Sequence, residues 1–280
     1  MSYATLMVHL DLDQGNDARL SVVGDLAERF TARIIGVAAQ ARPVYYADDL
    51  DGARFVEADR GAMEDNLAEI RQRLQQAEER FRTALRGRAK QLEWRSSIED
   101  PIPYIADQCR VADLLVIGKT ASDEMQEPNT QINPIDLIAR TGRPLLIVPL
   151  HVQTLQAERI LVAWKDTREA RRAVLDALPL LKKSQHVIVC EIDEDHSPAD
   201  VQRHIDDVVT WLANHGVSGV GMVKPLRDSP AIQLEALAKQ EGADLIVAGA
   251  FGHSKLREWI FGGVTRDLLG QSSCCQLLAH

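Results

Sequence analysis

The sequence is poor in cysteine and in long apolar runs, and this excludes several classes of protein. None of its four cysteines, Cys109, Cys190, Cys274 and Cys275, forms a C-x-x-C pair. We therefore expect reduced thiols that serve as small buried hydrophobes in a cytoplasmic protein. No run is apolar for long enough to span a bilayer, and residues 1–11 lack the basic start of a signal peptide, so we expect a first strand there.

An excess of positive charge is also lacking. The chain carries 32 Lys and Arg residues against 41 Asp and Glu residues, which gives a formal net charge of -9. Nucleic acids are bound through clustered Lys and Arg, so we do not expect a nucleic acid as a partner. The net charge does not exclude a small anionic ligand, because such a ligand is affected mainly by the charges near its own binding site. The sequence shows no G-x-S-x-G or G-x4-G-K-[ST] motif and no histidine pattern typical of a metal site. It therefore indicates neither a catalytic residue nor a metal.

What is present is a repeat. Residues 112–118 (ADLLVIG) resemble residues 243–249 (ADLIVAG), and residues 6–11 correspond to residues 160–165. These short runs of Val, Ile and Leu are typical of strands buried on both faces of a parallel sheet. Between them the apolar period changes to that of a helix, so strands and helices alternate as in βαβ units.

The repeat predicts an α/β chain of two tandem domains, residues 1–150 and 151–280. Each domain should be a doubly wound, Rossmann-like, five-stranded and mostly parallel sheet, and the two separate sheets should be related by a pseudo-twofold axis. In the first half we expect helices over 16–30, 62–88 and from 101, and strands over 6–11, 32–39, 91–96, 112–118 and 144–149. In the second half we expect helices over 168–181, 198–214 and from 229, and strands over 160–165, 186–192, 217–223, 243–249 and 275–279. Thr167 is the expected N-cap of the helix over 168–181.

The first half is longer before its fourth strand. The extra residues fall in the segment 41–62, which is either an excursion or lid over the domain or a disordered surface loop.

A glycine-rich segment follows the fourth strand of the second half. Gly249, Gly252 and Gly262 have the spacing G-x2-G-x9-G, and the segment from the strand to the next helix ends in Gly263, Val264 and Thr265. Glycines let backbone approach a ligand, and free amides at a helix N-terminus bind anions. His253 adds local positive character, and ligands of open α/β sheets lie beyond the carboxyl ends of strands. The segment therefore predicts a phosphate-binding loop.

This loop resembles that of the universal stress protein family, whose ATP-binding members carry G-x2-G-x9-G followed by Ser or Thr. Here Gly263 follows instead, and Thr265 supplies the hydroxyl. The resemblance covers the whole chain as a tandem member and includes the fifth-strand ending of residues 142–149. It implies that the two domains pair through their fifth strands, as an internal pseudo-dimer, with a further homodimer left open. It also implies a small adenine nucleotide, such as ATP, as ligand, without a demand for Mg²⁺.

The resemblance assigns base and ribose recognition to the ends of the first two strands. In the second half these positions are Ala163, Trp164, Lys165 and Ile192. The family has Asp where Lys165 stands, and a Lys cannot accept a hydrogen bond from adenine or ribose. In the first half Asp11 keeps the acidic residue, but the second and third glycines after Gly118 are missing. We therefore expect a first half that binds no ligand or is repurposed, and a second half that binds phosphate with altered base recognition.

Three functions are compatible with these features. The first is a stress-response sensor or regulator that binds an adenine nucleotide in its second half. The second is a non-catalytic interaction scaffold with vestigial sites, which Lys165 favours. The third, an enzyme of the wider nucleotide-binding α/β group, ranks last because catalytic groups are lacking, and at most slow ATP hydrolysis is expected.

Overall fold

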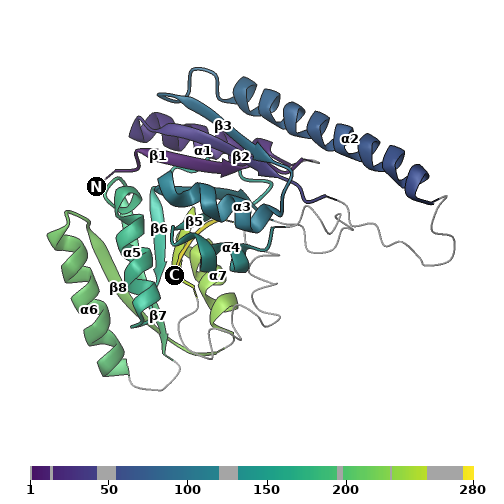
Figure 1. The fold of residues 1–280 in the computed structure, drawn as a ribbon. Coiled ribbons are helices and arrows are strands. Elements are labelled where there is room, and N and C mark those ends of the chain that lie inside the picture. Colours follow the sequence, from purple (N-terminus) through teal and green to yellow (C-terminus); the bar gives the residue numbers. More distant parts are fainter. Residues whose placement is uncertain are drawn as a thin grey trace.

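The structure is a computed structural model that describes residues 2–12, 15–42, 55–119, 132–193, 198–227, 229–250 and 274–280. Within these residues one sheet is formed, with the strand order β3-β2-β1-β4-β5-β10-β9-β6-β7-β8 (Figure 1). The strands of the first half are β1 (Thr5–His9), β2 (Arg33–Ala39), β3 (Leu92–Ser97), β4 (Leu114–Gly118) and β5 (Leu145–Val148). Those of the second half are β6 (Arg159–Ala163), β7 (His186–Asp193), β8 (Gly219–Pro225), β9 (Leu245–Gly249) and β10 (Cys275–Ala279).

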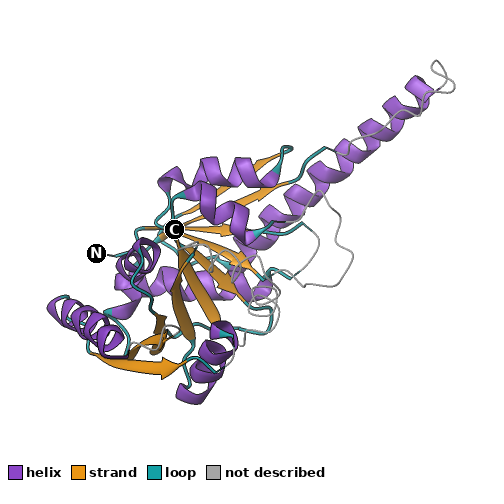
Figure 2. Cartoon of the chain, turned by 90° about the horizontal axis from the view of Figure 1, so that it is seen from below, coloured by secondary structure: helices purple, strands orange, loops and turns teal. Residues whose placement is uncertain are grey.

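The helices alternate with the strands, as the repeat predicts. They are α1 (Asp17–Phe30), α2 (Phe55–Ala84), α3 (Pro101–Gln108), α4 (Pro134–Thr141), α5 (Arg168–Leu181), α6 (Pro198–Asn214) and α7 (Pro230–Glu241), with a short 3-10 turn over Cys109–Val111. The bounds of α5 and α6 are those expected. Helix α2 begins at Phe55, so part of the inserted segment 41–62 is a helical extension, which projects past the sheet (Figure 2). Residues 43–54 lie outside the described residues.

The two halves join through their fifth strands. Neighbouring strands within each half are parallel, whereas β5 and β10 are antiparallel, with Leu146 opposite Leu277. The strand order reads the same from either edge, as a twofold axis between β5 and β10 requires. The expected pairing of the fifth strands is confirmed. The expectation of two separate sheets is wrong, because this pairing merges two five-stranded halves into one sheet and leaves neither fifth strand as an open edge.

Helices cover both faces of the sheet (Figure 2). Side chains of α1, α2, α5 and α6 share one apolar core on one face, and this core runs across both halves. On the other face α3 and α4 pack over the first half, while α7 packs over the second. All four cysteines are free and buried in these layers, as expected, and burial raises the pKa of the Cys109 and Cys190 thiols to about 12.

Polar contacts also tie the halves together beside the shared core. The Tyr3 hydroxyl donates to the Asp176 carbonyl oxygen at 2.7 Å, and burial raises the pKa of this hydroxyl. Lys183 Nζ donates to the Arg29 carbonyl oxygen at 2.7 Å and lies 4.7 Å from the centre of the Phe30 ring. The end of α1 is therefore fastened to the end of α5. Across the described ranges, no helix is both long enough and apolar enough to cross a membrane.

Candidate functional site

The carboxyl ends of β6 and β9 lie side by side in the second half. The two strands are parallel neighbours, with Ala163 opposite Ala248, so the chain leaves both strands at the same edge of the sheet. A Cβ at Gly249 would overlap the backbone of Glu169 and Ala170 at the start of α5. Only glycine allows this close approach. The first glycine of the predicted loop is thus required by the packing of β9 against α5, whatever else it does.

The N-terminus of α5 faces this edge and is already satisfied by its own side chains. The Thr167 hydroxyl accepts a hydrogen bond from the Ala170 amide at 3.2 Å, which confirms the predicted N-cap. Glu169 is buried in the first turn; burial favours a raised pKa, but its own backbone amide and Arg168 outweigh this and lower it. A carboxylate therefore occupies this helix N-terminus, which disfavours a second anion there.

The residues predicted to flank a base fall on two faces of the sheet. Ala163 packs with Ile192 in the core under α7, whereas the Trp164 side chain belongs to the core under α5 and α6. Ala163 and Ile192 therefore share one face of the sheet, and the Trp164 side chain lies on the other. Lys165 follows directly, is half-buried, and its carbonyl oxygen accepts from the Thr167 amide at 2.6 Å.

The remaining predicted site residues, Gly252, His253, Gly262, Gly263, Val264 and Thr265, lie outside the described residues.

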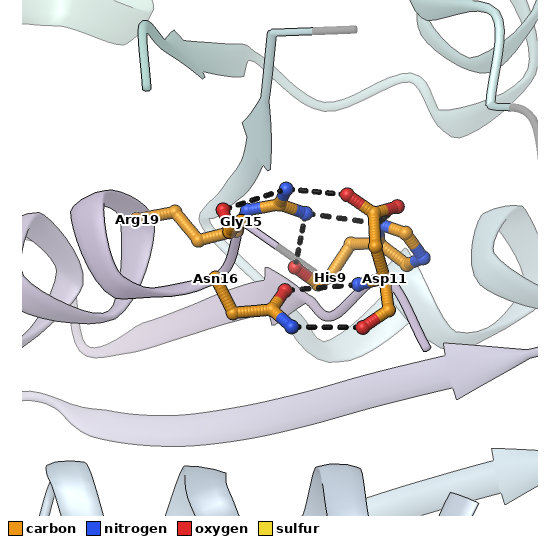
Figure 3. A network of polar contacts seen from close by, with 5 residues as sticks. All are labelled: His9, Asp11, Gly15, Asn16 and Arg19. Atoms are coloured by element: carbon orange, nitrogen blue, oxygen red, sulfur yellow. Dashed lines mark hydrogen bonds and ion pairs between the residues drawn. The ribbon is translucent and has the colours of Figure 1, made fainter. Parts of the chain in front are cut away.

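The corresponding edge of the first half holds a polar network (Figure 3). The Arg19 guanidinium forms an ion pair with Asp11, and it donates to the carbonyl oxygens of His9 at 3.0 Å and Gly15 at 3.2 Å. The Asn16 side chain accepts from the Asp11 amide at 2.9 Å and donates to the Asp11 carbonyl oxygen at 2.8 Å. The loop from β1 to α1 is therefore fixed around Asp11, the acidic residue that the resemblance assigns to ligand recognition.

Arg19 also fills the place above the fourth strand. A Cβ at Gly118 would overlap the Arg19 guanidinium, just as a Cβ at Gly249 would overlap the start of α5. The Arg19 side chain is almost entirely buried, and no partner of its Nε is found within the described residues. The first half thus places an internal cation where its strands β1 and β4 end.

Burial and charge set the protonation of this network. Burial lowers the pKa of His9 to about 4, with Arg19 adding to this effect and Asp11 opposing it. Burial alone would raise the pKa of Asp11, but the Arg19 guanidinium and His9 bring it below its ordinary value. At neutral pH the network therefore contains an ionised Asp11, a charged Arg19 and a neutral His9.

The Arg19 network is not among the features predicted from the sequence. Its signal lies in the spacing of α1, because Arg19 stands four and seven residues before the buried Val23 and Leu26 and so falls on the buried stripe of the helix. A charged residue on such a stripe needs a partner of opposite charge. Asp11, one loop earlier, is that partner.

Comparison with known proteins bears on the second half directly. The sequence model of the universal stress protein family matches residues 212–279. The resemblance to universal stress proteins is thereby confirmed. The matched stretch runs from the end of α6 through β10 and contains the whole G-x2-G-x9-G segment. No curated protein sequence matches the chain.

Solved structures extend the likeness to the whole chain as a fold. A universal stress protein from Archaeoglobus fulgidus superposes with a TM-score of 0.69, at 16% sequence identity, over 98% of this chain and 95% of that chain. A functionally unknown protein from Pseudomonas aeruginosa matches with a TM-score of 0.51, at 15% identity, over 99% of this chain and 92% of that chain. This chain therefore shares the fold of two joined α/β halves with the universal stress protein from Archaeoglobus fulgidus.

Proposed function

We propose that this protein is a stress-response sensor or regulator that binds one adenine nucleotide, ATP, ADP or AMP, in its second half. The observation that carries the proposal is the G-x2-G-x9-G segment, which starts at Gly249 where β9 ends. It lies in the stretch that matches the universal stress protein family. The loop leaves the sheet at the edge where ligands of such folds bind.

The phosphates of the nucleotide would contact the loop, and its base would contact the ends of the strands. The phosphates would accept hydrogen bonds from the backbone amides of Gly252, Gly262, Gly263 and Val264, the Thr265 hydroxyl, and the side chains of His253 and Lys165. The base would lie against Ala163 and Ile192, which share one face of the sheet. Because Lys165 is only a donor, adenine selectivity should be weak.

The first half would stay without nucleotide. Arg19 already forms an ion pair with the Asp11 carboxylate and fills the space at Gly118, so a ligand would have to displace a buried guanidinium. Because β5 and β10 are antiparallel, the carboxyl ends of the two halves lie at opposite edges of the sheet, and one ligand cannot use both. Residues 1–150 would thus serve as a structural partner of residues 151–280.

A thermal unfolding series with ATP, ADP, AMP and GTP tests this function. A ligand at 100 times its Kd stabilises the native state by about 2.7 kcal/mol, which raises the Tm by several degrees. We expect a rise with the adenine nucleotides, none in Gly252→Asp, and a larger rise in Lys165→Asp. Gly61→Asp is the matched control, because a Cβ at Gly61 meets nothing within 4 Å. If no nucleotide shifts the Tm of either the native protein or Lys165→Asp, the scaffold function that Lys165 favours replaces this one.

A further inference from the structure

The two outer strands of the sheet are β3 and β8, and β3 carries a row of hydrogen-bonding groups along its outer side. Within the described residues β3 pairs with β2 only. The carbonyl oxygens of Gln91 and Ser97 accept hydrogen bonds, at 2.9 Å and 3.3 Å, from amides on the side of β2. Alternate residues of a strand bond the same neighbour, so the backbone groups of Leu92, Trp94 and Ser96 are directed away from β2. Such a row can bind a further strand.

The other outer strand, β8, is poorly suited to such pairing. The Leu226 amide donates to the Asp193 carbonyl oxygen of β7 at 3.1 Å, so the residues directed outward are the alternate ones from Gly219 to Pro225. Among them Gly219 and Gly221 have no side chain to pack against a partner, and Pro225 has no N–H. Of the two outer strands, β3 is therefore the one that offers both backbone groups and side chains to a further strand.

Two opposite charges on β3 decide which strand fits. Glu93 and Arg95 lie on the face of the sheet that α3 covers, because the intervening Trp94 side chain packs against the core under α2. Arg95 Nη2 lies 2.7 Å from Glu93 Oε1, and the two side chains are 24% and 34% exposed. Charges on an outer strand disfavour most partners, since pairing would bury each charge without a counter-ion. The exception is a strand that places a carboxylate opposite Arg95 and a cation opposite Glu93.

A second copy of β3 in antiparallel orientation meets this requirement. With a twofold axis beside Trp94, that residue lies opposite the partner's Trp94, Leu92 lies opposite the partner's Ser96, and Glu93 lies opposite the partner's Arg95. The residues with outward backbone groups then form the hydrogen-bonded pairs, and the charged residues form the non-hydrogen-bonded pairs, whose side chains lie closer together. Aromatic pairs and pairs of opposite charge both stabilise neighbouring strands.

Helix α2 leaves the outer side of β3 accessible. The ring centres of Phe81 and Trp94 are 5.5 Å apart, and a Cβ at Gly36 of β2 would overlap both rings. Phe81 therefore lies over β2 and β3 together and not beyond the edge of the sheet. None of the residues of β3 is buried.

We propose that the protein forms a homodimer in which the β3 strands of two copies pair antiparallel around Trp94, with Glu93 of each copy opposite Arg95 of the other. The pairing joins two ten-stranded sheets into one continuous sheet with β8 at both ends. Because β8 does not offer a comparable edge, association stops at the dimer and does not continue into a fibre. Within the chain, β5 and β10 are already joined by an antiparallel pairing of the same kind.

Sedimentation equilibrium of the full chain tests this pairing by charge reversal. We expect a dimer for the native protein. Glu93→Arg and Arg95→Glu each place like charges opposite one another, and each should weaken association by about tenfold or more. Mixed in equal amounts, the two variants should form a heterodimer, because each supplies the charges that the other lacks. Arg203→Glu, which reverses one charge of an exposed ion pair on α6, is the matched control and should leave the dimer intact.

Cysteine variants locate the contact without charge reversal. All four native cysteines are buried, so a mixture of Glu93→Cys and Arg95→Cys should form an intermolecular disulfide on mild oxidation, faster than either variant alone. If circular dichroism shows that a charge variant is not folded, this cross-link decides. The proposal is overturned if the native protein stays monomeric at the highest attainable concentration, or if folded Arg95→Glu dimerises as tightly as the native protein. It is equally overturned if the mixed charge variants do not associate, or if the mixed cysteine variants do not cross-link.

Discussion

The Arg19 side chain occupies the space that a Cβ at Gly118 would need, so α1 closes the first half at the end of β4. The same guanidinium is held by Asp11 at the end of β1. One buried cation thus links the two neighbouring strand ends where the second half has Lys165 and Gly249. The two halves share a fold, but they differ in what their strand ends can accept.

Gly118→Ala should destabilise the protein by about 1–3 kcal/mol, because the methyl group displaces a buried, ion-paired guanidinium. Urea denaturation measures the change. Gly61→Ala in α2 is the control, since its Cβ meets nothing within 4 Å and alanine favours a helix by about 0.5–1 kcal/mol. Equal stability of Gly118→Ala and the native protein would show that Arg19 does not fill this space.

Asp11→Asn should destabilise the protein by about 1–3 kcal/mol, because it leaves the buried Arg19 charge without its counter-ion. The figure is reduced by the partial exposure of the Asp11 side chain, which is 37%. Asp200→Asn breaks an exposed ion pair with Arg203 and should change the stability by less than about 0.5 kcal/mol. The two variants are compared by urea denaturation at pH 7, and equal losses would contradict the buried network.

The contribution of His9 to the stability of the protein should fall as the pH drops from 6.5 towards 4. The pKa of His9 is about 4 in the folded protein and 6.5 in the unfolded chain. Between these two pH values the unfolded chain therefore binds a proton at His9, whereas the native state does not. The difference corresponds to about 3 kcal/mol, present above pH 6.5 and lost towards pH 4. The contribution of Asp11 to the stability changes only below this window, because the pKa of Asp11 in the folded protein is lowered.

The variant His9→Asn isolates this effect. Its stability should depend less on pH between 6.5 and 4 than that of the native protein, as urea midpoints measured across the window will show. Parallel pH curves for the two proteins would mean that His9 is accessible to protons in the native state.

Tyr3→Phe should cost about 1 kcal/mol, because it removes the hydroxyl that donates to the Asp176 carbonyl oxygen across the two halves. Tyr104→Phe is the control, since the structure records no hydrogen bond from that hydroxyl within the described residues. Thermal unfolding should show a lower Tm for Tyr3→Phe than for Tyr104→Phe. The reverse order would contradict a stabilising contact at the seam.

The order of strands and helices could be predicted from the sequence because apolar periodicity is local. Helix α5 keeps its expected bounds, since Thr167 caps it and Ala173, Val174 and Ala177 form its buried stripe. The union of the two halves into one sheet could not be predicted, because it depends on how β5 and β10 meet. The sequences of both strands are short apolar runs, and such runs are compatible with two sheets that pack face to face as well as with two strands that pair edge to edge.

The site was predictable only as far as its residue types. The glycine spacing predicts a phosphate loop. The direction of each side chain, however, depends on how side chains alternate between the two faces of the sheet at the end of β6, where Ala163 and Trp164 lie on opposite faces. Arg19 was missed because its partner Asp11 lies in another element. The spacing of α1 marks Arg19 as a charged residue on the buried stripe, but it does not show which residue pairs with it.

Calorimetric titration with ATP tests the central claim that the second half alone binds nucleotide. The account predicts one ATP per chain for the native protein, tighter binding by Lys165→Asp, and no binding by Gly252→Asp. Two ATP molecules per chain, no binding by both the native protein and Lys165→Asp, or unchanged binding by Gly252→Asp would contradict it.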